Sequence, residues 1–396
     1  MSASRWVELP APAAHQVQSL STELNNLHPS LATILINRGI DTFQKSKKFF
    51  RPELDSLHDP MLMKDMEVAV RLVNDTLASN HKILIYGDYD VDGTTSVAMM
   101  YAYLRQYTKQ LEFYIPDRYS EGYGISEKGM NYAMDQDVRL IISLDCGIKA
   151  LTQIQLAVDA GINFIVCDHH EPGNTLPPAH AILDPKRKDC TYPFKELSGC
   201  GVGYKLMEAI EISNNRDKSQ LVSFLDLTAT SIAADIVPIV EENRLLAYFG
   251  LKQINSDPRP GIQALIEVSE LNRKLSISDL VFRLAPKINA AGRLESGLAA
   301  VDMLISEDLS SAKKKAIYIH QLNLQRRDLD AEVTQEAIDL LRQDSTNSTK
   351  KTTVIYHPEW HKGVIGIVAS RLIEKFYRPT VVLTQSNGWL TGSVRS

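Results

Sequence analysis

Three short apolar runs, each followed at once by an acidic residue, constrain the fold of this chain more than any other feature. They are KILIYGDYD, VRLIISLDCG and NFIVCDHHE, and helical stretches such as TTSVAMMYAYLRQY and ALTQIQLAVDAG lie between them. Short strands that alternate with helices form a parallel sheet, and crossover helices cover both of its faces. We therefore expect an α/β domain whose acidic residues gather beyond the carboxyl ends of the strands, where such sheets bind ligands.

The length of 396 residues predicts two or three domains. We expect a helical N-terminal extension over residues 1–75, an α/β domain over 76–308, a long connecting helix over 309–345 and a second, smaller α/β unit over 346–396. The long helix has apolar residues three or four apart, with no Gly or Pro. We interpret it as a spacer between two domains, although a helix packed wholly in one core has the same pattern. The polar stretch QDSTNSTKKTT then predicts a linker, and the final GWLTGSVRS predicts an incomplete second unit.

Several classes of protein are disfavoured by composition. No run approaches ~18 apolar residues, so we expect no transmembrane helix. The N-terminus lacks a secretory apolar core, so we expect a cytoplasmic protein. The net charge of −5 argues against a wholly basic nucleic-acid coat but leaves room for a local basic channel. The cysteines form no CxxC pair, so we expect reduced, buried thiols at Cys146, Cys167, Cys190 and Cys200.

The stretch YGDYDVDG places Asp88, Asp90 and Asp92 two residues apart at the end of the first predicted strand. A turn at Gly93 would present several of these oxygens to one point. The opening of an EF-hand has the same DxDxDG pattern, but its loop needs a glutamate at the twelfth position. That position here is Met99, so we reject the EF-hand.

Asp145 ends the second run, His169 ends the third, and Asp235 follows in FLDLTATSIAADIVPI. Each acid alone has an ordinary explanation, such as a helix cap or a turn anchor. Converging carboxylates would repel one another, and a divalent cation removes that penalty. Carboxylates with one imidazole suit Mn²⁺, Mg²⁺ or Fe, and two ions would suit hydrolysis of a phosphodiester. We expect Asp168 to accept a hydrogen bond from the ligating imidazole, and His170 to face the substrate and bind a phosphate oxygen or protonate the leaving group.

These motifs resemble the DHH phosphoesterase superfamily, and within it the RecJ-type exonucleases, which act 5′→3′ on single-stranded DNA. The resemblance runs from about residue 30 to the end, and its C-terminal part is similar to a DHHA1 domain. It rests on DYDVDG, SLDCG, CDHHEP, ADIVP, IPDRYSEGYGIS, LSGCGVGYKL, PKINAAGRL, HPEWHKGVIGIVASRL and GSVRS.

The resemblance implies roles for individual residues. Manganese or magnesium would be held by Asp90, Asp92, Asp145, His169 and Asp235, with Asp145 as the bridge and Asp88 a further candidate. His170 would contact the scissile phosphate, and catalysis would involve His170, Asp145 and Asp168. A 5′-phosphate pocket would use Arg118, Ser393 and Arg395.

Other residues are candidates for binding the strand, each with an alternative structural role. Tyr119 and Tyr123 would stack on bases or pack in the core or at the rim. Asn289 and Arg293 would line the path of the strand or pack domains together. His361 and Gly363 precede a helix whose N-terminus would meet phosphates. Arg118 would otherwise be a surface ion-pair residue.

The resemblance also implies partners: single-stranded DNA with a 5′ end, a single-strand-binding protein and a helicase, in repair and recombination, with the enzyme a monomer. The alternative is a DHH-family phosphodiesterase acting on short oligonucleotides or small nucleotides. An inactive scaffold protein is disfavoured because every expected ligand is present. We expect two departures from the family's pattern: the chain would lack an OB-fold, and GSVRS carries valine where glycine is common, which would stiffen a loop or narrow the pocket.

Overall fold

The structure is a computed structural model that describes residues 5–344 and 349–396. It divides into two compact units, Met1–Leu57 and His58–Ser396. The predicted boundary at residue 75 differs from this division, because the helix that precedes the first strand packs with the second unit. Positions 345–348 of the predicted linker, like positions 1–4 of the N-terminus, lie outside the described residues.

The first unit is helical, as expected for this part of the chain. Its core packs Leu20 against Ala32 and Leu35, with partly buried apolar neighbours around them. Its helices are α1 (Ala14–Glu23), α2 (Pro29–Asn37), α3 (Phe43–Phe50) and the 3₁₀ turn η1 (Leu54–Ser56).

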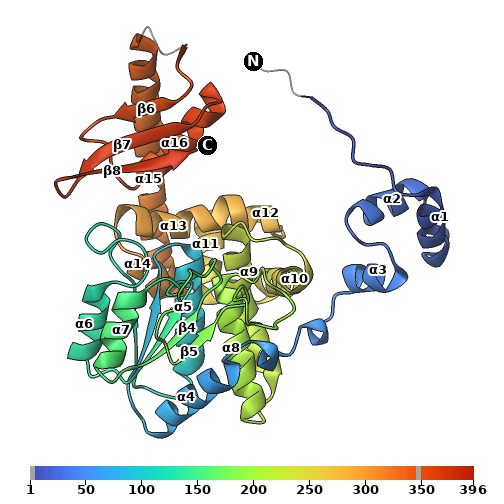
Figure 1. Ribbon diagram of the computed structural model, residues 1–396, viewed down its shortest axis with the longest axis horizontal. Helices are drawn as coiled ribbons and strands as arrows, with labels where there is room; N and C mark the ends of the chain where they lie inside the picture. The colour runs from blue at the N-terminus through green and yellow to red at the C-terminus, as the bar shows by residue number, and fades with distance from the viewer. Residues whose placement is uncertain (1–4, 345–348) are drawn as a thin grey trace. The chain divides into compact units, whose positions relative to one another are not determined.

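A five-stranded parallel sheet lies at the centre of the second unit, in the order β2-β1-β3-β4-β5 (Figure 1). The α/β class predicted from the sequence is confirmed. The sequence analysis missed the edge strand β2, whose residues are mostly only half-buried. The strands are β1 (Ile83–Gly87), β2 (Leu111–Tyr114), β3 (Leu140–Leu144), β4 (Asn163–Cys167) and β5 (Ala181–Leu183).

Helices cover both faces of this sheet, which explains why its strands are almost continuously apolar. Tyr86, Ile141 and Phe164 point to the face covered by α6 and α7. Leu144 points to the opposite face, where it meets Gly203 of α8. Helices α4 and α5 pack on that side with α8. The bounds are η2 (Pro60–Leu62), α4 (Met66–Ala78), α5 (Val91–Leu104), α6 (Glu127–Asp135), α7 (Leu151–Asp159), α8 (Gly199–Ser213), η3 (Lys218–Phe224) and α9 (Leu225–Ala234).

A group of helices follows the sheet and ends in α15 (Leu309–Gln343), which has 35 residues. The first half of α15 packs on α11, α13 and α14, and its second half packs on α16. The helix therefore belongs to two cores, which agrees with a spacer and not with packing in one core alone. The others are α10 (Glu241–Ser256), α11 (Pro260–Val268), α12 (Ile277–Asp279), the π-helical turn η4 (Leu280–Leu284), α13 (Ala285–Leu294) and α14 (Leu298–Leu304).

The C-terminal residues form a three-stranded sheet, β6-β7-β8, with β7 parallel to β6 and antiparallel to β8. One face packs on α15 and α16 through Ile355 and Val382. The other face exposes Val354 and Val394. The elements are β6 (Thr353–Tyr356), α16 (Ile365–Phe376), β7 (Thr380–Ser386) and β8 (Trp389–Arg395).

Two further expectations concern the described residues. None of their helices combines the length and the apolar character needed to cross a membrane. All four cysteines are buried and free, as the absence of CxxC pairs suggested.

Candidate metal centre and surrounding basic residues

Acidic residues follow four of the five parallel strands directly. Asp88 comes after β1, Asp145 after β3, Asp168 after β4 and Asp184 after β5, and all four are almost fully buried. Because parallel strands end at the same edge of the sheet, these carboxylates lie in one region. Asp235 follows no strand, since it caps the end of helix α9.

The ring of His169 lies at the centre of a cluster of carboxylates. Its Nε2 is 3.1 Å from Oδ1 of Asp145, 3.4 Å from Oδ2 of Asp235 and 3.7 Å from Oδ2 of Asp92. Asp92, His169 and Asp235 can offer ligand atoms to one cation, and Asp145, His169 and His170 form a second such group. The two groups share His169, whose ring nitrogen ligates one cation at a time, so both groups describe one cluster around this ring.

Unsatisfied polar atoms show that the cluster fits a cation. Both ring nitrogens of His169, Oδ1 of Asp145 and Oδ2 of Asp235 are buried without a hydrogen-bond partner. Burying such atoms unpaired is costly, and a bound cation would satisfy the two carboxylate oxygens and one ring nitrogen of His169. Oxygen and imidazole ligands without thiolates suit Mn²⁺ or Mg²⁺.

The electrostatics of the cluster point the same way. Burial and the charges of Asp92 and Asp90 raise the pKa of Asp145 well above its usual value. Burial and the same two charges raise the pKa of Asp235 to about 8. Burial lowers the pKa of His169, which favours the neutral ring and leaves one of its nitrogens available as a ligand. A divalent cation would reverse the carboxylate repulsion that causes the first two shifts.

Backbone and hydroxyl donors fix the orientation of Asp92. Its Oδ2 accepts from the N–H of Gly199 at 2.7 Å, and its Oδ1 accepts from the N–H of Cys200 at 2.9 Å and from Ser231 Oγ at 2.7 Å. A Cβ at Gly199 would lie 2.6 Å from Cβ of Asp145, so only glycine allows α8 to begin this close to the cluster. The glycine-rich start of α8 therefore positions two candidate ligands.

Asp88 and Asp90 have different surroundings from Asp92. Asp88 accepts from the N–H of Tyr89 at 2.7 Å and of Gly124 at 3.2 Å, and it is not among the groups that share a cation position. Burial and the charge of Asp90 raise the pKa of Asp88 to about 7. Asp90 caps α5 by accepting from the N–H of Gly93, and it lies beside Asp145. Asp90 therefore remains next to the cluster, whereas Asp88 anchors a loop.

Asp168 holds His170 and not His169, which corrects our expectation of its partner. Its Oδ1 lies 2.8 Å from Nδ1 of His170, and its Oδ2 accepts from the N–H of Ile148 at 2.9 Å. This hydrogen bond and the charge of Asp168 raise the pKa of His170. The side chain of His170 is 41% exposed, so its ring can reach a ligand outside the cluster.

The loop between β2 and α6 brings aromatic rings to the cluster. Tyr123 is exposed, and its ring stands edge-on to Tyr89 at 5.7 Å and to His170 at 6.4 Å. The guanidinium of Arg118 lies 5.0 Å from the ring centre of Tyr89, and its Nε is buried without a hydrogen-bond partner. Arg118 therefore makes a cation–π contact beside the cluster and forms no ion pair among the described residues.

Tyr119 connects the loop between β2 and α6 to α13 and to the C-terminal sheet. Its hydroxyl donates to the backbone oxygen of Arg293, its ring lies 5.7 Å from His361, and its own carbonyl accepts from Asn387 at 3.1 Å. These contacts make Tyr119 a bridge between subdomains, not a free stacking platform. Lys362, which the sequence analysis did not single out, adds a bond to the carbonyl of Arg118 at 3.3 Å.

Arg293 and His361 lie at the same junction. Arg293 donates to the carbonyl of Gly363 at 3.2 Å, and burial with the charge of Arg118 lowers its pKa to about 10. The N–H of Gly363 donates to Nδ1 of His361 at 3.1 Å, so this backbone group already has a partner. Asn289 lies half-buried on α13, in the helix that carries Arg293.

Ser393 and Arg395 share one face of β8 and lie over the start of α16. Arg395 Nη1 is 3.0 Å from Ser393 Oγ, and a Cβ built at Gly366 would lie 3.3 Å from each of the two side chains. Val394 points to the opposite face, where it is 62% exposed. Our expectation that this valine stiffens a loop or narrows the pocket is wrong, because the segment is a strand and adjacent residues alternate between faces.

Asp184, directly after β5, is a further buried acid that the sequence analysis did not single out. It is fully buried, its Oδ2 has no hydrogen-bond partner, and burial raises its pKa to about 7. The signal was present in AILDP, where an acid again follows an apolar run directly. The charge of Lys186 adds to the lowering of the pKa of His169 and partly opposes the rise in the pKa of Asp235, so its ammonium lies near the cluster.

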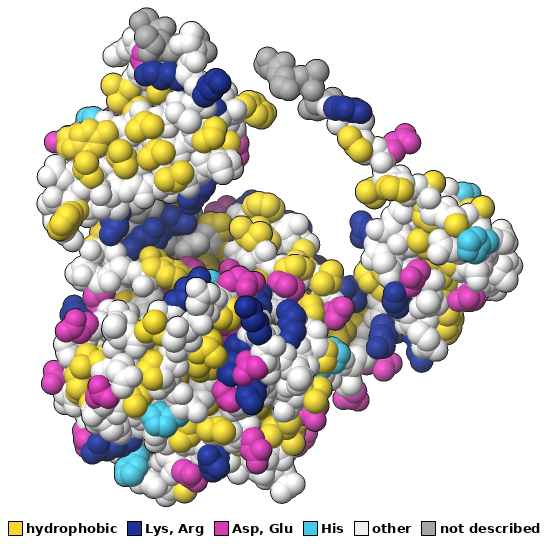
Figure 2. Space-filling view, in the orientation of Figure 1, with side chains coloured by type: hydrophobic (Ala, Val, Ile, Leu, Met, Phe, Trp, Pro, Cys, Tyr) yellow, Lys and Arg dark blue, Asp and Glu magenta, His cyan; other side chains and the backbone are white. Residues whose placement is uncertain are grey.

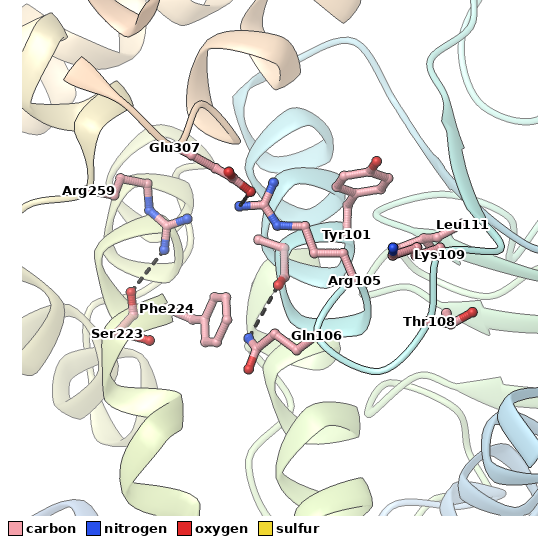
Figure 3. A pocket seen from close by; sticks show the side chains of 11 residues that line it. Tyr101, Arg105, Gln106, Thr108, Lys109, Leu111, Ser223, Phe224, Arg259 and Glu307 are labelled. Atoms are coloured by element: carbon pink, nitrogen blue, oxygen red, sulfur yellow. Dashed lines mark hydrogen bonds and ion pairs between the residues drawn. The ribbon is translucent and has the colours of Figure 1, made fainter. Parts of the chain in front are cut away.

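A cavity of about 680 Å³ lies at the other end of α5 (Figure 3). It is lined by Arg105, Lys109 and Phe224 among others, and Arg259 is fixed there by its ion pair with Asp226 at 2.7 Å. Since α5 has 14 residues and begins at the metal cluster, the cavity is roughly 20 Å from it. None of the predicted site residues lines this cavity.

Comparisons with known proteins agree with this geometry. Residues 82–232 match the DHH family, N-terminal domain. The single-stranded-DNA-specific exonuclease RecJ of Bacillus subtilis is 39% identical over 398 residues, which cover 100% of this chain and 49% of that protein. The protein of the same name from Dickeya dadantii is 37% identical, with 95% of this chain and 67% of that protein covered. The chain belongs to the RecJ family.

Solved structures of RecJ proteins have the same fold. A crystal structure of exonuclease RecJ bound to manganese is 30% identical, with a TM-score of 0.77, and the match covers 87% of this chain and 84% of that one. RecJ from Thermus thermophilus in complex with Mn²⁺ is 28% identical, with a TM-score of 0.83 and coverage of 98% and 54%. The chain thus spans about half the length of the Bacillus subtilis RecJ.

Proposed function

We propose that this chain is a divalent-cation-dependent nuclease that removes nucleotides from the 5′ end of single-stranded DNA. The observation that carries the proposal is the cluster of Asp92, Asp145, His169 and Asp235, with its buried, unpartnered ligand atoms. The RecJ family membership supports the choice of single-stranded DNA as substrate. A monomer that works with a single-strand-binding protein and a helicase in repair and recombination remains a prediction.

The candidate ligands Asp90, Asp92, Asp145, His169 and Asp235 would hold Mn²⁺ or Mg²⁺. A pair of such cations lowers the pKa of water and stabilises the charge on a phosphate during an in-line displacement. The protein's part is to orient these oxygens, as the donors on Gly199, Cys200 and Ser231 do for Asp92.

His170, held by Asp168, would donate a proton or a hydrogen bond at the scissile phosphate. Asp168 accepts from the Nδ1–H of His170, which leaves Nε2 of the exposed ring to contact a phosphate oxygen or the leaving oxygen. Because Asp168 raises the pKa of His170, more of this imidazole is protonated near neutral pH.

Basic residues beside the cluster would bind the end of the strand. Arg118 and Arg293 flank the cluster on one side, and Ser393 and Arg395 lie over the start of α16. The N-terminus of a helix favours anions, and a guanidinium offers two donors to one phosphate. We infer that these residues take the 5′-phosphate, with Tyr123 against a base.

Digestion of matched strands tests the proposal. Single strands labelled at the 5′ or the 3′ end, with a duplex control, are incubated with Mn²⁺ or with EDTA. We expect the 5′ label to appear first as a mononucleotide, only with Mn²⁺ and only from single strands. Mononucleotide release that begins at the 3′ end, or that continues in EDTA, would contradict the proposal.

The alternative is a phosphodiesterase of short oligonucleotides, which would use the same cluster. The length of α15 and the basic junction around Arg293 favour a polymer. Comparison of the rates on a long strand and on a dinucleotide distinguishes the two, since the alternative predicts faster hydrolysis of the dinucleotide.

A further inference from the structure

The loop between β2 and α6 carries Arg118 and Tyr123, and one buried carboxylate joins its two ends. The side chain of Glu121, in the middle of this loop, is only 4% exposed. Its Oε1 accepts from the backbone N–H of Asp117 at 2.9 Å, at the start of the loop. Its Oε2 accepts from the hydroxyl of Ser126 at 2.5 Å, at the end of the loop. A single side chain therefore closes the loop on itself.

Two tyrosines of the central sheet hold the closed loop in place. The hydroxyl of Tyr114, on β2, donates to Oε2 of Glu121 at 2.9 Å. The hydroxyl of Tyr86, on β1, accepts from the N–H of Ser126 at 3.0 Å and donates to the carbonyl of Gly124 at 3.2 Å. The loop is thus fixed to two neighbouring strands, and Glu121 takes part in one of these two attachments.

The charge of Glu121 has little compensation from a cation. The nearest ammonium is that of Lys128, whose Nζ lies 3.6 Å from Oε1 and whose side chain is 69% exposed. An ion pair with so exposed a partner contributes little, and a buried carboxylate is costly unless it is well hydrogen-bonded. The burial of Glu121 therefore depends on its bonds to the loop and to β2, and those bonds constrain the course of the loop.

The constrained segment presents two residues of the proposed substrate site. The guanidinium of Arg118 lies beside the cluster on a neighbouring aromatic ring, and the exposed ring of Tyr123 stands 6.4 Å from His170. Among the described residues, the hydrogen bonds of Glu121 go to backbone and hydroxyl groups and not to these two side chains. Glu121 therefore acts on Arg118 and Tyr123 through the backbone of the loop.

The same loop reaches the C-terminal sheet. The carbonyl of Tyr119 accepts from Nδ2 of Asn387 at 3.1 Å, and the carbonyl of Arg118 accepts from Nζ of Lys362 at 3.3 Å. Lys and Arg side chains gather in the hollow where this sheet meets the larger body (Figure 2). A loop that opened would therefore displace Arg118 and would also break contacts at this junction.

We propose that Glu121 is a positioning residue for the 5′ end of the strand. Its carboxylate keeps the loop closed, so that Arg118 and Tyr123 are in place before the substrate binds. Groups that are ordered in advance lose less conformational entropy on binding, so the contribution of Glu121 falls on affinity. The cluster around His169 lies on other segments, so the chemical step changes little. The inference rests on the proposed function and deepens it.

Steady-state hydrolysis of single strands with a 5′-phosphate or a 5′-hydroxyl, in Mn²⁺, tests this role. For Glu121→Ala we expect KM on the phosphorylated strand to rise about tenfold or more, while kcat stays within about twofold. KM on the 5′-hydroxyl strand should rise less, because that strand offers no terminal phosphate to Arg118. Glu121→Gln keeps one oxygen as an acceptor and should lie between Glu121→Ala and the wild type.

Glu112→Ala is the matched control. Glu112, on β2, also accepts from a lysine and a tyrosine, at 2.9 Å from Nζ of Lys82 and 2.7 Å from the hydroxyl of Tyr132. Both partners lie outside the loop. This variant should therefore keep the KM values and the 5′-phosphate preference of the wild type.

Trypsin digestion in EDTA reports on the loop without any need for activity. Cleavage after Arg118 should be faster in Glu121→Ala than in the wild type and in Glu112→Ala, because the loop opens more often. An unchanged cleavage rate, or unchanged KM and preference in Glu121→Ala, would overturn the proposal. So would a loss confined to kcat. If the wild type itself does not cut single strands from the 5′ end, the proposed function fails instead, and the digestion still decides whether Glu121 closes the loop.

Discussion

Nδ1 of His170 lies 2.8 Å from Oδ1 of Asp168, and the same oxygen accepts the backbone N–H groups of His169 and His170. Asp168 therefore fixes both the backbone of the two histidines and the ring of the second. The two histidines therefore have different surroundings. The ring of His169 faces the carboxylates, and His170 keeps a protonated Nδ1 and an exposed Nε2.

Replacing Asp168 with Asn should lower the pKa of His170, because the charge and the hydrogen bond that raise it are lost. If His170 donates a proton to the leaving group, activity is lost as pH rises through its pKa. The alkaline limb of the kcat profile should then move to lower pH, and the maximal rate should fall at least about tenfold. The profile is measured at saturating Mn²⁺. His170→Gln should lack this limb, and an unmoved limb in Asp168→Asn would count against the role of His170.

Asp145→Asn should abolish hydrolysis while making the metal-free protein more stable. The substitution removes a buried carboxylate whose pKa is raised well above normal by burial and by neighbouring acids. Loss of a direct ligand should cost more than the roughly 10- to 100-fold that outer partners contribute. Calorimetry with EDTA or Mn²⁺ checks both effects. Asp137→Asn, at an exposed acid, is the control, and retained Mn²⁺-dependent cutting in Asp145→Asn would refute the assignment.

The stability of the metal-free protein should fall as pH rises from about 5 to about 9. The pKa values of Asp88 and Asp235 are raised in the folded state to about 7 and about 8. The folded protein therefore binds more protons than the unfolded chain, and its advantage is present at low pH and lost as pH rises through these values. Tm in EDTA should decrease by on the order of 5 °C over this range.

Two further measurements complete that test. Mn²⁺ should raise Tm more at high pH than at low pH, because protonated carboxyls do not bind it. Asp235→Asn should flatten the pH dependence of Tm in EDTA. If the Tm of the wild type in EDTA stays constant or rises as pH increases, burial and mutual repulsion do not raise the pKa values of these carboxylates.

Arg395→Gln should reduce the preference for a 5′-phosphate over a 5′-hydroxyl by about tenfold or more, the effect of losing a charge-assisted hydrogen bond. Arg395 lies beside Ser393 and over Gly366 near the start of α16. The initial rates on the two kinds of strand give the preference. Val394→Thr is the matched control, because Val394 points to the other face of β8. An equal loss of the 5′-phosphate preference in both variants would mean that the preference depends on the structure of β8 and not on the guanidinium of Arg395.

The sequence predicted much of the carboxylate cluster because its residues follow a local rule. Asp145 comes directly after β3 and His169 is the second residue after β4, and parallel strands bring such positions together. The same rule would have found Asp184, which ends the short run AIL. Asp235 obeys no such rule, since it caps a helix, and its place at the cluster depends on how α9 packs against α5 and α8.

Contacts between segments that are far apart in the chain could not be predicted from the sequence. Tyr119 and His361 are 242 positions apart, and nothing local indicates that they touch. Which histidine ring bonds to Asp168 depends on the directions of the His169 and His170 side chains. The position of these residues after a strand does not determine those directions. The face of Val394 was misjudged because GSVRS was taken as a loop, whereas its pairing with Val381 makes it a strand.

Helix α15 contributes side chains to two separate cores, and this fixes the angular relation between the carboxylate cluster and Arg395. One residue added to its middle would turn everything beyond it by about 100° and advance it by about 1.5 Å. The number of residues in α15 therefore determines both the distance and the relative rotation of the two cores that it joins.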